Sequence, residues 1–259
     1  SRLYSDIHNL SSQLALQLKT LSNNQNTETQ KLTQTKLINQ HMAWLTALRY
    51  KLREEKPWEN LHESGNKQFM NACYTIPERE VPLETSLAPL LSEKEFKTFI
   101  ARRNDPLYCL ELQQNIIEQL HKEKQIDKEC FVTARYIIDQ LITKQTNCIR
   151  IKENPFPRNF YSMTKIFLKI FLIALPFSIL SELPDTETIF HVIPLTIVIG
   201  WVFICLEKVG QNTSNPFEGG VNDVPITTIS RQIEITLKTT GGFSEIPKPI
   251  EPMSGRILL

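Results

Sequence analysis

Residues Ile166–Leu206 read IFLKIFLIALPFSILSELPDTETIFHVIPLTIVIGWVFICL. This stretch holds two apolar runs, Ile166–Leu183 and Phe190–Leu206, which are joined by a short acidic link. As α-helices that rise about 1.5 Å per residue, the runs would each cover roughly 25–27 Å, slightly less than the roughly 30 Å hydrocarbon core of a bilayer. One such run would be marginal, but the pair predicts a helical hairpin that spans a membrane.

The charges around the two runs predict the orientation of the hairpin. The link carries acidic residues and no Lys or Arg, whereas basic residues flank the outer ends of the runs: Lys152, Arg158, Lys165, Lys169 and Lys208. Under the positive-inside rule, both outer ends are cytoplasmic and the link lies outside. The alternative is a buried helical hairpin in a soluble protein, which runs of this length with one-sided flanking charge disfavour.

Two prolines, Pro176 and Pro194, lie within the runs and predict a kink in each helix. Membrane helices tolerate such kinks where neighbouring groups satisfy the freed carbonyls. Two kinked helices cannot enclose a water path alone, so an ion path would need further helices or further copies of the chain.

The overall composition limits the classes of function. The mean hydropathy of −0.23 over 259 residues predicts that most of the chain lies in water. A net charge of +1 provides no global field for nucleic acid, and no nucleic-acid partner is expected. The five cysteines lack a CxxC spacing, which favours reduced thiols over a zinc site. No nucleotide-binding, hydrolase or metal-ligand motif is present, so we expect no catalytic residue, no metal and no cofactor.

Apolar periodicity predicts an all-α chain outside the hairpin. Helices are expected over residues 3–21, 30–53, 92–103, 106–123, 127–147 and 226–238. We expect a loop over 22–29, irregular structure over 59–91, and an extended tail from Gly241 that is either a strap or disordered. His41 is interpreted as a packing or hydrogen-bonding residue, and Glu78-Arg79-Glu80 as a solvated face.

Three stretches together resemble the bestrophin family of ion channels, in its bacterial branch. The first is His41-Met-Ala-Trp-Leu-Thr-Ala-Leu-Arg49 and its continuation to Arg53. The second runs from Cys148 through Ile149-Arg150-Ile151-Lys152 to Pro155-Phe156-Pro157 and Tyr161, and the third is Asn215-Pro216-Phe217 followed by Asn222-Asp223-Val224-Pro225-Ile226. Their order, their spacing and the hairpin between the second and third carry the resemblance, which covers nearly all of the chain.

The resemblance implies a homopentamer around a central ion path, with four membrane helices per subunit and a large helical cytoplasmic region. Ser1-Arg2 is similar to the point just after the second membrane helix of the family, so the first two membrane helices, including the pore neck, are expected outside the sequence shown. The implied divisions are a cytoplasmic helical region over 1–157, a transmembrane hairpin over 158–209, and a cytoplasmic helix with an extended tail over 210–259.

The family also implies a second, cytoplasmic constriction formed by an apolar side chain on the helix before the hairpin. Val132 is the candidate for this side chain and Phe131 the next; the alternative is that Val132 is an ordinary core residue. Animal members follow Asn-Pro-Phe with an acidic run that binds calcium. Here only Glu218 and Asp223 are acidic in that segment, so a calcium site is not expected. Asn222 and Asp223 are instead predicted to cap the helix that begins near Pro225.

The resemblance thus predicts a subunit of an ion channel in a bacterial inner membrane, which passes monovalent ions without covalent chemistry. The sign of the ion stays open at this stage. Two alternatives also remain: a membrane-anchored helical scaffold that binds a partner, and a soluble helical enzyme with a buried hairpin.

Overall fold

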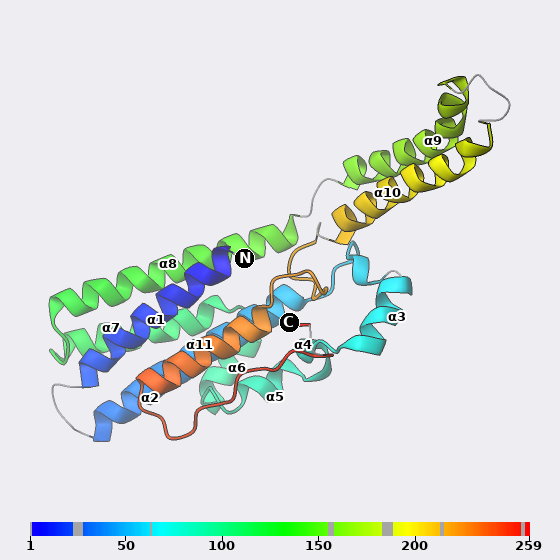
Figure 1. Cartoon of the computed structure of the whole chain (residues 1–259). Helices are drawn as coiled ribbons and strands as arrows, with labels where there is room; N and C mark the ends of the chain where they lie inside the picture. The colour runs from blue at the N-terminus through cyan, green and yellow to red at the C-terminus, as the bar shows by residue number, and fades with distance from the viewer. Residues whose placement is uncertain are drawn as a thin grey trace. The chain divides into compact units, whose positions relative to one another are not determined.

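The structure is a computed structural model that describes residues 2–22, 28–62, 64–154, 158–182, 189–212, 215–254 and 257–259. It divides into two compact units, which we call the helical body (Ser1–Lys152 and Phe217–Leu259) and the apolar hairpin (Glu153–Pro216). The long helices of the body are α1 Arg2–Ser22, α2 Glu28–Arg53, α6 Glu93–Ala101, α7 Leu107–Lys122, α8 Lys128–Glu153, which runs one residue past the body's boundary, and α11 Ile226–Thr240 (Figure 1).

Helix α2 is the central element of the helical body. It contacts α1, α7, α11 and the short α5 (Leu83–Leu87), and its buried face includes Trp44, Leu48 and Leu52. Helix α11 follows the hairpin in the sequence, yet it packs against both α1 and α2 (Figure 1). The core of the body is therefore built from segments on both sides of the hairpin.

The helix boundaries follow local sequence signals. Ser92 and Glu95 form the predicted capping box at the start of α6, and Asp127 Oδ1 accepts the Cys130 N–H at 2.7 Å at the start of α8. Helix α8 continues six residues past the predicted end at Asn147, because Cys148 and Lys152 extend its buried face by one turn. Of the predicted loop over 22–29, residues 23–27 lie outside the described residues, while Glu28 is already helical.

The prediction of irregular structure over 59–91 is wrong for much of this segment. It contains η1 Asn60–His62, α3 Ser64–Cys73, α4 Pro77–Glu80 and α5. Pro77 is the first residue of α4 and Pro82 is the N-cap of α5, so both prolines begin helices. Proline is tolerated in the first turn because the N–H that it lacks would have no intrahelical partner there.

The apolar hairpin consists of α9 Arg158–Glu182 and α10 Val192–Asn212, with the short η2 Ile189–His191 before α10. Two 20-residue spans, Ser162–Ser181 and Val192–Gln211, have mean hydropathies of 1.9 and 2.0, and only 6% and 11% of their most apolar windows are buried. Both are long and apolar enough to cross a membrane. The predicted link lies mostly in residues 183–188, outside the described part of the chain.

The two prolines of the hairpin differ in their position. Pro176 lies inside α9, as predicted. Pro194 does not interrupt a helix, because α10 begins only at Val192 and Pro194 therefore falls in its first turn. The helices contact each other through the rings of Phe171 and Phe203, whose centroids are 4.7 Å apart.

The tail after α11 is extended, and it forms a strap on the surface of the helical body. Met253 and Ile257 form an isolated antiparallel bridge, and the Thr228 N–H donates to the Leu259 oxygen at 2.6 Å. Ile257 and Leu259 pack in a small apolar cluster with Leu61, Tyr74 and Ile76.

Candidate functional site

The first candidate site is the start of α8, where sequence reasoning places the constriction. The side chain of Val132 is 55% exposed, so Val132 is not a core residue of the helical body. Tyr136, one turn further along α8, is 61% exposed. Phe131 points elsewhere, because its ring is half-buried and stacks on His121 with the centroids 4.3 Å apart. The pore role of both residues stays a prediction.

The second candidate site is the loop that follows the hairpin. One carboxylate organises it: Asp223 Oδ1 accepts the backbone N–H groups of Phe217 (3.0 Å) and Val224 (2.6 Å). Its Oδ2 accepts the Gly219 N–H at 2.9 Å and Arg53 Nη1 at 3.1 Å. Phe217 has a φ of 64° and Gly219 one of 95°, so the backbone of this loop is left-handed at two positions. Because an aromatic residue rarely adopts positive φ, we attribute the conformation to these hydrogen bonds.

The prediction that Asn222 and Asp223 cap the next helix is wrong. The N-cap residue of α11 is Pro225, and no side-chain cap hydrogen bond is formed at the start of this helix. Asp223 is already engaged by the N–H groups of its own loop, while Asn222 is exposed. Asn215 and Pro216, which precede the loop, are half-buried.

A buried ionic cluster lies beside this loop. Lys152 Nζ contacts Glu59 Oε1, and their side chains are only 4% and 1% exposed. Arg79 Nη2 lies 3.7 Å from Glu59 Oε2, and Glu218 Oε1 accepts the Leu61 N–H at 2.5 Å. The short segment Glu59–Leu61 therefore holds both Lys152, just before the hairpin, and Glu218, just after it.

The cluster changes one interpretation made from the sequence. Lys152, counted from the sequence among the basic residues that flank the hairpin, is buried and paired. Burial lowers the pKa of Lys152, an effect that Glu59 opposes. Burial also raises the pKa of Glu218. Both acids that a calcium site would require here, Glu218 and Asp223, already accept hydrogen bonds from the chain itself.

The predicted solvated face Glu78-Arg79-Glu80 is also wrong for its first two residues. Glu78 is buried, where it accepts a hydrogen bond from Thr227 at 2.8 Å and lies 3.4 Å from Arg49 Nη1. Arg79 lies 3.1 Å from Glu55. A charged triplet carries no signal of such partners, since they lie far away in the sequence.

His41 is a hydrogen-bonding core residue, as predicted. It is fully buried, with Nε2 2.9 Å from Ser11 Oγ and Nδ1 3.3 Å from Gln113 Oε1. Burial lowers its pKa to about 4. The ring is therefore neutral at pH 7. Among the described residues, no group of three or more His, Cys, Asp or Glu could hold a metal ion.

The buried ring of His41 predicts a loss of stability in mild acid. Its pKa falls from 6.5 to about 4 on folding, so between these values the unfolded chain binds a proton that the folded chain excludes. Stability should be fully present above pH 6.5 and fall as the pH drops towards 4, by up to about 3 kcal/mol. Melting curves at pH 7.5 and 5 should show a smaller pH effect in His41→Gln than in the wild type. Equal effects would contradict this prediction.

These observations define a class of protein: an all-helical body joined to an apolar hairpin long enough to cross a membrane. The chain matches the family described as Bacterial/Fungal Bestrophin protein over residues 1–239, and it belongs to that family. Its fold is that of a bacterial bestrophin homologue from Klebsiella pneumoniae, with a TM-score of 0.74 and 16% identity; the match covers 94% of this chain and 77% of that one.

Two curated relatives are also similar to the chain. The voltage-dependent anion channel-forming protein YneE of Escherichia coli K12 is 23% identical over 180 residues, which are 70% of this chain and 58% of the relative. A voltage-dependent anion channel-forming protein of Synechocystis is 22% identical over 160 residues, or 62% of this chain and 50% of the relative. The chain thus spans little more than half the length of the curated relatives it matches.

Proposed function

We propose that the chain is a subunit of a pentameric ion channel that passes small monovalent ions down their gradient across a bacterial inner membrane. The two apolar spans carry this proposal, since 6% and 11% burial leaves both helices uncovered by protein. Lipid and neighbouring subunits are the natural cover for such surfaces. The names of the curated relatives favour anions as the ions that pass.

The proposed topology places the hairpin, residues 158–209, in the bilayer and the flanking regions 1–157 and 210–259 in the cytoplasm. Basic residues in the outer parts of the two helices, Arg158, Lys165 and Lys208, support it under the positive-inside rule. The buried pairing of Lys152 removes one charge from that count, whereas Lys169, in the first half of the first span, is exposed. An exposed lysine there can extend its ammonium group towards the lipid headgroups.

The proposed cytoplasmic constriction is a ring of five Val132 side chains. Its support is that Val132 is exposed on the single chain and followed by the exposed Tyr136, so this side of α8 is available to face an axis. A ring of apolar side chains impedes hydrated ions by dewetting and by its narrow width, without any charge.

Val132→Ala is expected to increase ion flux severalfold, because five smaller side chains widen and wet the constriction. The measurement is ion flux in liposomes reconstituted with the full-length protein. Val81→Ala is the matched control, since Val81 is also exposed and lies in the helical body, and it should leave the flux unchanged. An equal flux in both variants would reject Val132, and no flux from any form would reject the channel.

The mass of the particle in detergent should be measured on the same samples. A pentamer supports the proposed assembly. A monomer or dimer supports the alternative of a membrane-anchored scaffold whose hairpin only tethers the helical body.

A further inference from the structure

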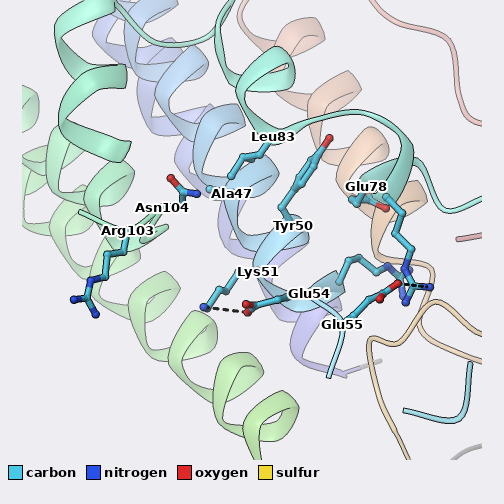
Figure 2. A pocket seen from close by; sticks show the side chains of 11 residues that line it. Ala47, Tyr50, Lys51, Glu54, Glu55, Glu78, Leu83, Arg103 and Asn104 are labelled. Atoms are coloured by element: carbon cyan, nitrogen blue, oxygen red, sulfur yellow. Dashed lines mark hydrogen bonds and ion pairs between the residues drawn. The ribbon is translucent and has the colours of Figure 1, made fainter. Parts of the chain in front are cut away.

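A cavity of about 470 Å³ opens into the helical body beside the C-terminal end of α2 (Figure 2). The short helix α4, the start of α5 and the turn between α6 and α7 form its other walls. Four basic residues line it: Lys51, Arg53, Arg79 and Arg103. Val132 and the described residues of the apolar hairpin are not among the residues that line this cavity.

Two of these arginines have donors that the described residues do not satisfy. The residue Arg53 is 3% exposed, and its Nη1 donates to Asp223, but its Nε and Nη2 are buried and have no partner in the described part of the chain. The same holds for Nε of Arg79, whose Nη1 lies 3.1 Å from Glu55. Because a buried donor without an acceptor is costly, three such donors beside one cavity indicate a missing ligand with acceptor oxygens.

The carboxylates of the cavity leave these donors unsatisfied, although each is engaged through one oxygen; Glu55, for example, pairs with Arg79 Nη1. Glu54 lies 3.2 Å from Lys51 and 3.1 Å from Lys56, and the first of these contacts is drawn in Figure 2. Glu78 is held by Arg49 and Thr227. The ligand must therefore bring its own negative oxygens.

The cavity also holds two acceptors without partners among the described residues. Oε2 of Glu78 and Oδ1 of Asn104 are both buried. Figure 2 shows Asn104 and Glu78 among the residues that line the cavity. A fitting ligand should therefore carry a hydrogen-bond donor as well as anionic oxygens. A phosphate that retains an O–H, or a phosphate ester with hydroxyl groups, has both.

We infer that this cavity binds a small phosphate-bearing solute, with Arg53 and Arg79 as its principal donors. Each arginine also contacts the loop that follows the hairpin, because Arg53 Nη1 donates to Asp223 at 3.1 Å and Arg79 Nη2 to the Glu218 carbonyl at 3.5 Å. The bound solute would thus share both side chains with this loop. The inference does not depend on conduction, since it concerns binding alone.

Calorimetric titration of the full-length protein in detergent tests this site, with inorganic phosphate and glycerol 3-phosphate as separate probes at matched ionic strength. Saturable binding of either probe supports the site, and the tighter one identifies a free phosphate or an ester as the preferred form. Sulfate should bind more weakly, because it has the same shape but no O–H at neutral pH. Equal binding of sulfate, or no binding of either probe, overturns the inference.

Arg79→Gln should weaken phosphate binding by about tenfold or more, since a hydrogen bond to a charged group is lost. Arg102→Gln is the matched control, because Arg102 pairs with Glu111 on the surface and does not line the cavity. A second variant, Leu83→Glu, retains every arginine and adds a carboxylate to the half-buried wall, so it should abolish binding. Unchanged binding in Arg79→Gln and Leu83→Glu, or equal weakening in Arg102→Gln, contradicts the site.

Discussion

Asp223→Ala should lower the stability of the helical body by roughly 3–5 kcal/mol, the range found when one partner of a buried charge pair is removed. The variant deprives three backbone N–H groups and the guanidinium of Arg53 of their acceptor. Arg53 would then remain buried without a counter-charge, and Phe217 would lose a bond that holds its positive φ. The melting temperature of the full-length protein in detergent measures the effect.

Asp127→Ala is the matched control for this substitution. Asp127 caps α8 through one hydrogen bond to the Cys130 N–H, and such a cap is typically worth about 1 kcal/mol. The decrease in melting temperature should therefore be clearly smaller than for Asp223→Ala. Similar decreases for the two variants would mean that Asp223 has no organising role in the loop.

Lys152→Met should destabilise the protein by a comparable amount, because the buried side chain of Glu59 would lose its closest counter-charge. The double variant Lys152→Met/Glu59→Gln should recover much of the loss, since neither buried charge remains. A double-mutant cycle of melting temperatures separates this coupling from simple loss of packing. Additive effects of the two substitutions would contradict the assigned ion pair.

Lys144→Met provides a control on the same helix. Lys144 lies 2.8 Å from Asp6, but both side chains are partly exposed, at 25% and 34%. Exposed ion pairs contribute little because water and salt screen them. The melting temperature should therefore change only slightly in this variant.

The elements of this fold that the sequence predicts are those with a local cause. Each of these signals is visible within a few residues. They are the apolar runs, the capping box at Ser92, the cap at Asp127, and the periodic spacing of apolar residues along α1 and α2. The sequence also favours a packing or hydrogen-bonding role for His41, because no second metal ligand lies one turn away. The resemblance to the family rests on three short stretches that can be read directly from the sequence.

The interactions that the sequence does not reveal join residues far apart in the chain. Lys152 and Glu59 are 93 residues apart, and Arg53 and Asp223 are 170 apart. Charge patterns alone therefore count Lys152 among the basic residues that flank the hairpin and place Glu78 in solvent, whereas both are buried with partners. The same limit applies to the cavity, since its arginines come from α2, from α4 and from the turn after α6, and only the fold brings them together.

The packing of α11 on α1 and α2 has a consequence for biosynthesis. Helices α9 and α10 are translated before α11. The faces of α1 and α2 that α11 covers therefore stay uncovered while the hairpin is synthesised. The helical body can therefore complete its core only after the whole hairpin has been synthesised.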